Sequence, residues 1–213
     1  YISQTFSSCV SLLRNGVLTT VAGKCGFGGY ADGDPLQARF QHPHSISLDP
    51  RNESVLYLND AECWDDEPFP DDQKWQPCAK TSGGVCFSGI RKLELDRSTG
   101  SVVRVSTLSG KNSPKRSYTY YYYSCNDFAD GDQSEAMFNF IHGTAFLPLS
   151  EDEKAQKQAG ESLGGSDAIY VADEDGNRIR KVDLQTKITT TVAGSGKDGL
   201  VDGAGSKATF NYP

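Results

Sequence analysis

The chain has 213 residues, of which 37% are hydrophobic and 23% charged, so it is long and apolar enough to bury a core. Its net charge of −7 argues against partners with a phosphate backbone and against an anionic membrane surface. No apolar run approaches the roughly 20 residues of a membrane-spanning helix. The 22 glycines, ten tyrosines and ten phenylalanines favour strands and turns, which predicts an all-β fold.

One phrase recurs along the chain and sets its organisation. It reads ADGDPLQARF from residue 31, ADGDQSEAMF from 129 and VDGAGSKATF from 201. A strand-like segment precedes each copy: VLTTVAG, VVRVSTLSG and ITTTVAG. Short apolar or alternating segments such as SISLD, VLYLND and AIYVAD follow, separated by turn residues. The unit is therefore a four-stranded antiparallel meander that needs a similar unit on either side, as in a β-propeller.

In chain order, this repeat predicts an incomplete ring. Residues 9–22 read as the last two strands of a preceding blade, 31–108 as a first full blade and 130–193 as a second. Residues 201–213 begin another blade. A ring needs about four to eight blades, and the chain begins at Tyr1 and not at Met, so we expect it to be part of a longer protein.

The repeated motifs resemble a known family. The combination of V-x-T-x-A-G, D-G…A-x-F-x-x-P, I-Y-V-A-D and N-R-I-R-K is similar to the NHL-repeat β-propeller family. Its best copy runs from Ala168 to Pro213, and the first unit departs from it at Ser88-Gly89, where the second has Asn177-Arg178. The resemblance implies a propeller scaffold.

Three insertions interrupt the repeat. Residues 60–88 hold Trp64, Trp75 and several acidic residues, and they predict either a disulfide-stapled surface loop or a partner-binding loop. Residues 149–166 are polar and predict a mobile hairpin extension without chemistry.

The insertion at 111–125 combines basic residues with tyrosines, among them Tyr120, Tyr121 and Tyr122. Aromatic rings beside basic groups such as Lys115 and Arg116 can stack single-stranded RNA, and some NHL propellers bind RNA. Because the basic cluster is local and the chain is acidic, we expect these tyrosines to serve a protein partner instead, and RNA remains the second alternative.

Six cysteines stand at positions 9, 25, 63, 78, 86 and 125, with no CxxC pair. An even number without zinc-finger spacing favours disulfides and a secreted, luminal or extracellular location. We expect Cys63 to pair with Cys78 or Cys86. Cys25 and Cys125 precede equivalent copies of the repeated phrase, which predicts a bridge between them across the blade boundary.

Two of the three histidines occupy the same repeat position. His44 and His142 each lie just before an inner strand, where equivalent positions converge on the channel of a propeller. Pro-His-Ser at 43–45 resembles the zinc-binding segments of peptidyl-hydroxyglycine alpha-amidating lyases, which implies His44 and His142 as metal ligands. Two ligands do not make a catalytic zinc site, so hydrogen bonding at the channel mouth is favoured, with His42 as a loop residue.

Other enzyme signatures are missing from the sequence: it has no P-loop, no G-x-S-x-G turn and no HExxH. Asp173, Glu174 and Asp175 are predicted to accept backbone amides and to pair with Arg178 or Arg180. Some six-bladed lactonases hold calcium, yet no segment here has the spacing of a dedicated calcium loop.

The sequence therefore predicts a non-catalytic propeller scaffold without a cofactor, binding a protein or other ligand outside the cytosol. The alternative is a metal-dependent lyase or hydrolase that uses zinc or calcium in the channel.

Overall fold

The computed structural model shows an all-β chain, as predicted, with one α-helix in its described part. It describes residues 1–61, 86–113, 117–118, 123–124, 128–147, 149–161 and 167–213, with only the backbone described at residue 86 and in the short strands within 112–124.

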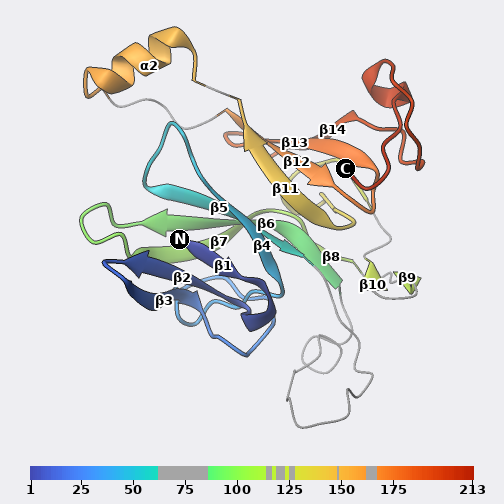
Figure 1. Ribbon diagram of the computed structural model, residues 1–213. Helices are drawn as coiled ribbons and strands as arrows, with labels where there is room; N and C mark the ends of the chain where they lie inside the picture. The colour runs from blue at the N-terminus through green and yellow to red at the C-terminus, as the bar shows by residue number, and fades with distance from the viewer. Residues whose placement is uncertain (62–85, 114–116, 119–122, 125–127, 148, 162–166) are drawn as a thin grey trace.

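Three antiparallel sheets of three or more strands follow one another along the described part of the chain (Figure 1). The N-terminal sheet has the order β1 (Ile2–Gln4), β2 (Cys9–Arg14), β3 (Val17–Gly23). The first full blade has the order β4 (Pro43–Leu48), β5 (Val55–Ala61), β6 (Cys86–Leu95), β7 (Val102–Ser109). The second full blade has the order β11 (Ile141–Phe146), β12 (Ala168–Asp173), β13 (Arg178–Asp183), β14 (Thr189–Ala193). Each sheet is a meander of sequential strands, which is the blade pattern that the repeat predicts.

Smaller elements lie between and after the blades. β8 (Asn112–Ser113) pairs with the start of β6, and β9 (Ser117–Tyr118) pairs with β10 (Tyr123–Ser124). Turns of 3-10 helix occupy Thr5–Ser7 and Gly205–Lys207. Both ends of the predicted insertion 60–88 belong to paired strands, since β5 runs through Ala61 and β6 begins at Cys86.

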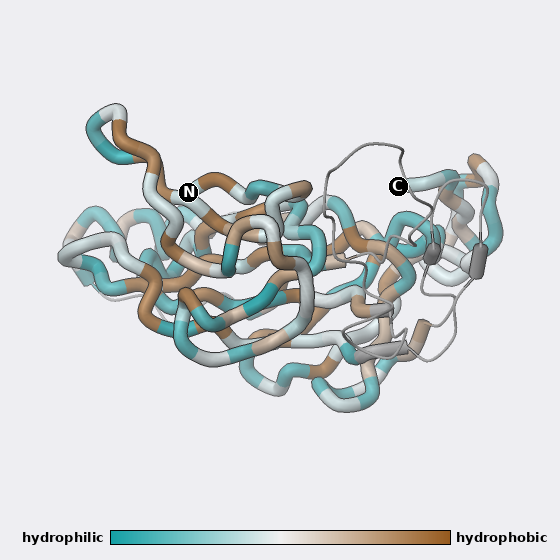
Figure 2. The backbone as a smooth tube through the Cα atoms, turned by 90° about the horizontal axis from the view of Figure 1, so that it is seen from below, coloured by the Kyte–Doolittle hydropathy of each residue, from teal (hydrophilic) through white to brown (hydrophobic). Residues whose placement is uncertain are grey.

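The core lies between the blades, because each face of the first full blade packs on a different neighbour. Val55 and Tyr57 of β5 belong to the cluster shared with the second full blade. Leu56 and Leu58 belong to the cluster shared with the N-terminal sheet. Alternate residues of a strand face opposite sides, so the continuous apolar run VLYL fits a strand buried on both faces. Figure 2 shows hydrophobic residues in brown along the backbone.

We call the repeated phrase the DG element (31–40, 129–138 and 201–210), and its first two copies each run along the outer edge of a full blade. Gly33 exchanges backbone hydrogen bonds of 2.9 and 3.0 Å with Val105 of β7, and Gly131 does the same with Thr189 at the start of β14, at 3.1 and 2.8 Å. The DG element therefore covers a strand edge that would otherwise be open to pairing. Its alanine and phenylalanine are buried in the first two copies, where Ala38, Phe40 and Ala136 are 0% exposed and Phe138 is 1% exposed.

A fully buried arginine ties each of the first two DG elements to its blade. In the first full blade Arg91 of β6 donates to Asp60 of β5 at 3.0 Å and to Asp32 of the DG element at 2.7 Å. It also donates to the carbonyl oxygens of Ala31 and Arg39. In the second full blade Arg180 makes the same set of contacts with Asp173, Asp130, Ala129 and Met137. The prediction that Asp173 pairs with an arginine and accepts a backbone amide is confirmed.

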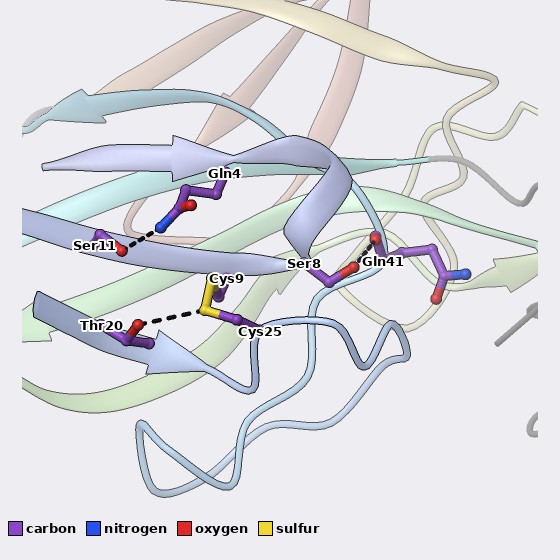
Figure 3. Close-up of a disulfide and its surroundings, with 7 residues drawn as sticks. All are labelled: Gln4, Ser8, Cys9, Ser11, Thr20, Cys25 and Gln41. Atoms are coloured by element: carbon purple, nitrogen blue, oxygen red, sulfur yellow. Dashed lines mark hydrogen bonds between the residues drawn. A yellow bond between two sulfur atoms is a disulfide. The ribbon is translucent and has the colours of Figure 1, made fainter. Parts of the chain in front are cut away.

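Burial and pairing act on these carboxylates in opposite directions. Complete burial raises the pKa of Asp60, while the charge of Arg91 and the N–H of Gln41 oppose that rise. The pKa of Asp130 falls below its usual value, because hydrogen bonds from Thr191 and Arg180 outweigh its partial burial. In the N-terminal sheet the equivalent register positions hold Ser11 and Gln4, and Gln4 Nε2 donates to Ser11 Oγ, so a neutral pair replaces the ion pair there (Figure 3).

The predicted bridge between Cys25 and Cys125 is wrong. Cys25 forms a disulfide with Cys9, with the Cα atoms 5.0 Å apart (Figure 3). Cys9 faces Gly23 across the β2–β3 hairpin, and the chain turns back after β3, where Gly26 N–H donates to the carbonyl oxygen of Ser7 at 2.8 Å. This turn brings Cys25 over its own hairpin, whereas Cys125 lies outside the described residues.

The predicted hairpin extension at 149–166 is also wrong, because its centre forms the helix α2 (Glu151–Gln158). Ser150 and Glu153 form a capping box: Ser150 Oγ accepts from Glu153 N–H and Glu153 accepts from Ser150 N–H. Glu153 also accepts from Arg51 Nε at 2.6 Å, which docks the helix on the β4–β5 turn of the neighbouring blade (Figure 1). No helix in the described part of the chain is long and apolar enough to span a membrane.

Acid should release α2 from this turn. The hydrogen bond from Arg51 holds the pKa of Glu153 at about 2, below its usual 4.5, so the stabilising contact is complete above pH 4.5 and is lost as the pH falls toward 2. The protection of the amides of residues 151–158, measured as exchange relative to the intrinsic rate at each pH, should fall over that range, and Glu153→Gln should show low protection already at pH 6. Glu151→Gln is the control, because the Glu151 side chain is 89% exposed and its ion pair is with Lys154 of the same helix. Equal exchange in both variants would contradict the docking role.

Candidate functional site at the inner rim

The predicted pair of histidines lies on the innermost strands of the two full blades. His44 is in β4 and His142 is in β11, and these strands lie beside each other. A hydrogen bond from the preceding sheet, repeated at the same register, fixes the backbone of each histidine. Ser3 Oγ of β1 donates to the carbonyl oxygen of His44, and Asn59 Nδ2 of β5 donates to the carbonyl oxygen of His142 at 2.8 Å. Each blade therefore positions the histidine of the next blade.

The side chains of these strands form an aromatic cluster. The ring centroids of His44 and His142 are 4.6 Å apart, and Phe140 lies 5.4 Å from the first ring and 4.9 Å from the second. His42 extends the row at 6.4 Å from His44, and Phe6 ends it at 6.0 Å from His42. We call these five rings the inner-rim cluster. It draws residues from all three sheets or the turns beside them.

An acidic residue orients the exposed end of this cluster. Glu174, just after β12, lies with Oε2 3.1 Å from His142 Nδ1, and Glu174 N–H donates to the carbonyl oxygen of Phe140 at 2.7 Å. With Nδ1–H donated to the carboxylate, His142 presents Nε2 to any partner. The side chains of His142 and Glu174 are 49% and 24% exposed. The cluster therefore offers imidazole and aromatic edges at an accessible surface.

The described residues do not fit the zinc site that the lyase resemblance implies. The structure brings His44 and His142 together, but Asp173 is committed to Arg180 and Asn139. Within the described ranges, no group of three or more His, Cys, Asp and Glu side chains is placed to hold a metal ion. Two imidazoles and one carboxylate bonded to the second imidazole give no three-ligand set.

The remaining predicted site residues lie outside the described part of the chain. They are Trp64, Trp75, Tyr120, Tyr121 and Tyr122, the RNA candidates Lys115 and Arg116, and the cysteines Cys63, Cys78 and Cys125, while Cys86 is described only in its backbone.

Sequence reasoning missed three members of the site. Phe6, Phe140 and Glu174 have no special spacing, and Phe6 lies before the first recognisable repeat. Phe140 is two residues from His142, so alternation along an extended segment could have placed both rings on one face. The Glu174 contact follows from the turn after β12 and has no signal in the sequence pattern.

Comparison with known proteins supports the repeat assignment. No protein-family model matches the chain. NHL repeat-containing protein 2 from Gallus gallus is 37% identical over 123 residues, which are 58% of this chain and 12% of that protein. The chain thus spans about an eighth of the length of this relative.

Two solved structures are similar only at low TM-scores, too low to bear on the fold or the function. An auxiliary nutrient binding protein from Bacteroides thetaiotaomicron gives a TM-score of 0.46 at 18% identity, covering 99% of this chain and 48% of that one. A protein of the same description from Bacteroides ovatus gives 0.43 at 16% identity, covering 83% and 43%. The resemblance to NHL-repeat β-propellers therefore rests on the meander sheets, the recurring DG element and the sequence match to an NHL repeat-containing protein over 123 residues.

Proposed function

We propose that the chain is a non-catalytic β-propeller scaffold that binds a protein or another ligand outside the cytosol. The inner-rim cluster is the observation that carries this proposal. Phe6 is 63% exposed at one end of the row of rings, and the side chain of His142 is 49% exposed at the other end. Exposed aromatic rings on a rigid frame are typical anchors of binding surfaces.

The frame supports a binding role because its parts are fixed before a partner arrives. Buried ion pairs of Arg91 and Arg180 stabilise the two full blades. Hydrogen bonds from Ser3 and Asn59 hold the backbones of His44 and His142. A preorganised surface loses little entropy on binding. The disulfide between Cys9 and Cys25 supports an oxidising compartment. We further propose that the insertions 60–88 and 111–125 supply specificity.

A crosslinking experiment tests this proposal. In the intact protein, a photoreactive phenylalanine analogue replaces Phe6, and in a matched control it replaces Val17 of β3, which is equally exposed at 63%. The Phe6 probe should capture one defined partner that the Val17 probe does not. With that partner purified, Phe6→Ala should weaken binding at least about tenfold. Equal capture at both positions would contradict an inner-rim binding site.

Metal analysis separates the scaffold from the enzyme alternative, in which His44 and His142 are metal ligands. The scaffold proposal expects no stoichiometric zinc in the intact protein. Stoichiometric zinc that disappears in His44→Ala and His142→Ala would establish a metal centre and defeat the non-catalytic assignment.

A further inference from the structure

An open pocket of about 570 Å³ lies at the outer boundary between the two full blades, away from the inner rim. The end of β7, two DG elements and the β13–β14 turn form its walls. Its lining residues are Tyr30, Asp32, Thr107, Gly110, Lys111, Asp132, Gln133, Ser134, Thr186 and Lys187. Apart from Gly110, each of these residues carries a polar or charged group that could bind a ligand.

One lysine of this pocket adopts a left-handed backbone conformation that residues other than glycine rarely adopt. Lys187 has φ +61° in the β13–β14 turn. The matching β6–β7 turn has the same hydrogen bond, from residue 100 N–H to Asp96 O, but there the position is Gly100 with φ +72°. A lysine at this position costs about 1 kcal/mol relative to glycine. Such local strain is concentrated at functional positions.

The strained lysine is held toward the pocket by a hydrogen-bonded relay. Lys187 Nζ donates to Gln133 Oε1 at 3.2 Å, and Gln133 Nε2 donates to the carbonyl oxygen of Thr107 at 2.6 Å. The amide of Gln133 is therefore fully oriented by two blades. The Lys187 ammonium keeps further donors for a ligand, since it has three N–H groups.

The carboxylates of the pocket already accept hydrogen bonds from donors of the protein itself. Asp32 accepts from Arg91 and from Thr107 N–H and Oγ1–H. Hydrogen bonds from Ser134 lower the pKa of Asp132, and the charge of Lys111 adds to that effect. Because the carboxylates are engaged, the two lysines supply the free donor capacity, while Asp132, Ser134 and Thr186 can still bind hydroxyl groups.

We propose that this outer pocket binds a small hydroxylated anion, of the uronate or sugar phosphate class, whose acidic group is held by Lys111 and Lys187. The polar wall at Asp132, Ser134 and Thr186 receives the hydroxyl groups. This site is separate from the inner-rim cluster and does not depend on the function proposed for it.

Titration of the intact protein with glucuronate, glucose 6-phosphate, inorganic phosphate and glucose, followed by NMR or calorimetry, tests the proposal. At least one of the two sugar acids should bind with a millimolar or lower Kd, and it should bind at least about tenfold more tightly than glucose or phosphate. Binding of glucuronate would identify the acidic group as a carboxylate, and binding of glucose 6-phosphate would identify it as a phosphate. Binding of neither acid, or equal binding of glucose, would overturn the anion site, and equal binding of phosphate would overturn the hydroxyl contacts.

The strained position supplies a variant whose folding is not in doubt. Lys187→Gly removes the ammonium and relieves the backbone, so its urea midpoint should be no lower than that of the parent protein while sugar-acid binding falls at least about tenfold. Lys111→Ala should lose binding to a similar degree. Lys24→Ala is the control, because Lys24 follows Gly23 as Lys111 follows Gly110 but lies over Phe27 at 3.9 Å. Unchanged binding in Lys187→Gly would contradict the proposal.

Discussion

Replacing Arg180 with methionine should lower the free energy of unfolding by about 3 to 5 kcal/mol, because the change leaves the buried carboxylate of Asp173 without its cation. Arg180 and Asp173 are both fully buried, and the pair links β12, β13 and the DG element through Asp130. The measurement is urea unfolding of the intact protein, followed by a probe in the second full blade.

Two further variants separate the loss of the Arg180–Asp173 ion pair from the general effect of a substitution in β13. Lys181→Met, at the next residue of β13, should cost less than about 0.5 kcal/mol, since no buried charge depends on it. The double variant Arg180→Met/Asp173→Asn should be more stable than Arg180→Met alone, because no buried carboxylate is then left unpaired. An Arg180→Met loss no larger than that of Lys181→Met would show that the arginine does not hold the blade together.

The second large effect is expected at Gly110, where Gly110→Ala should cost about 3 to 5 kcal/mol. Gly110 follows β7 with φ +110°, and an added Cβ would lie 2.6 Å from both Gly89 Cα and the carbonyl oxygen of Ser88. Both the backbone angle and the close approach of β6 therefore require glycine. Urea unfolding measures the loss.

Gly16→Ala is the matched control for Gly110→Ala. Gly16 also has a positive φ, +78°, but an added Cβ would meet no atom within 4 Å among the described residues. Only the backbone term remains there, about 1 to 2 kcal/mol. Equal losses at the two glycines would mean that the close packing of β6 against residue 110 contributes nothing.

The blade pattern could be predicted because it is written in short-range periodicity. Runs such as VLYL and AIYVAD have strand composition, and the DG element recurs with its buried Ala and Phe in place. The equivalence of His44 and His142 followed from counting along the repeat. These features depend on spacing within one unit, which the sequence displays directly.

The contacts that hold the blades together were harder to predict, because they join residues far apart in the chain. The repeat pattern assigns Asp60 to an insertion, yet it lies within β5, one residue before the strand ends, and is the buried partner of Arg91. The motif N-R-I-R-K shows that an arginine recurs, but it does not show that the side chain points inward to an aspartate of the DG element. Only the three-dimensional structure reveals that pairing, because Asp130 and Arg180 are 50 residues apart in the chain.

Two local errors have different causes. The helix α2 carries a capping box at Ser150 and Glu153, a signal that was present in the sequence and outweighs the scarcity of apolar residues. The pairing of Cys25 could not be read from equivalence between units. In the second full blade Arg178 and Gly196 occupy the register positions of Cys9 and Cys25, and an added Cβ at Gly196 would lie 2.1 Å from Arg178 Nη2. The disulfide thus replaces a side-chain contact within one blade.

A crystal structure of the intact protein tests the central claim most directly: the same ion-paired blade is repeated around one axis. We predict that β4 to β7 superpose on β11 to β14 with Arg91, Asp60 and Asp32 falling on Arg180, Asp173 and Asp130, and that β4 and β11 line a common channel. Sheets that do not superpose, or arginines that point to solvent, would contradict the account.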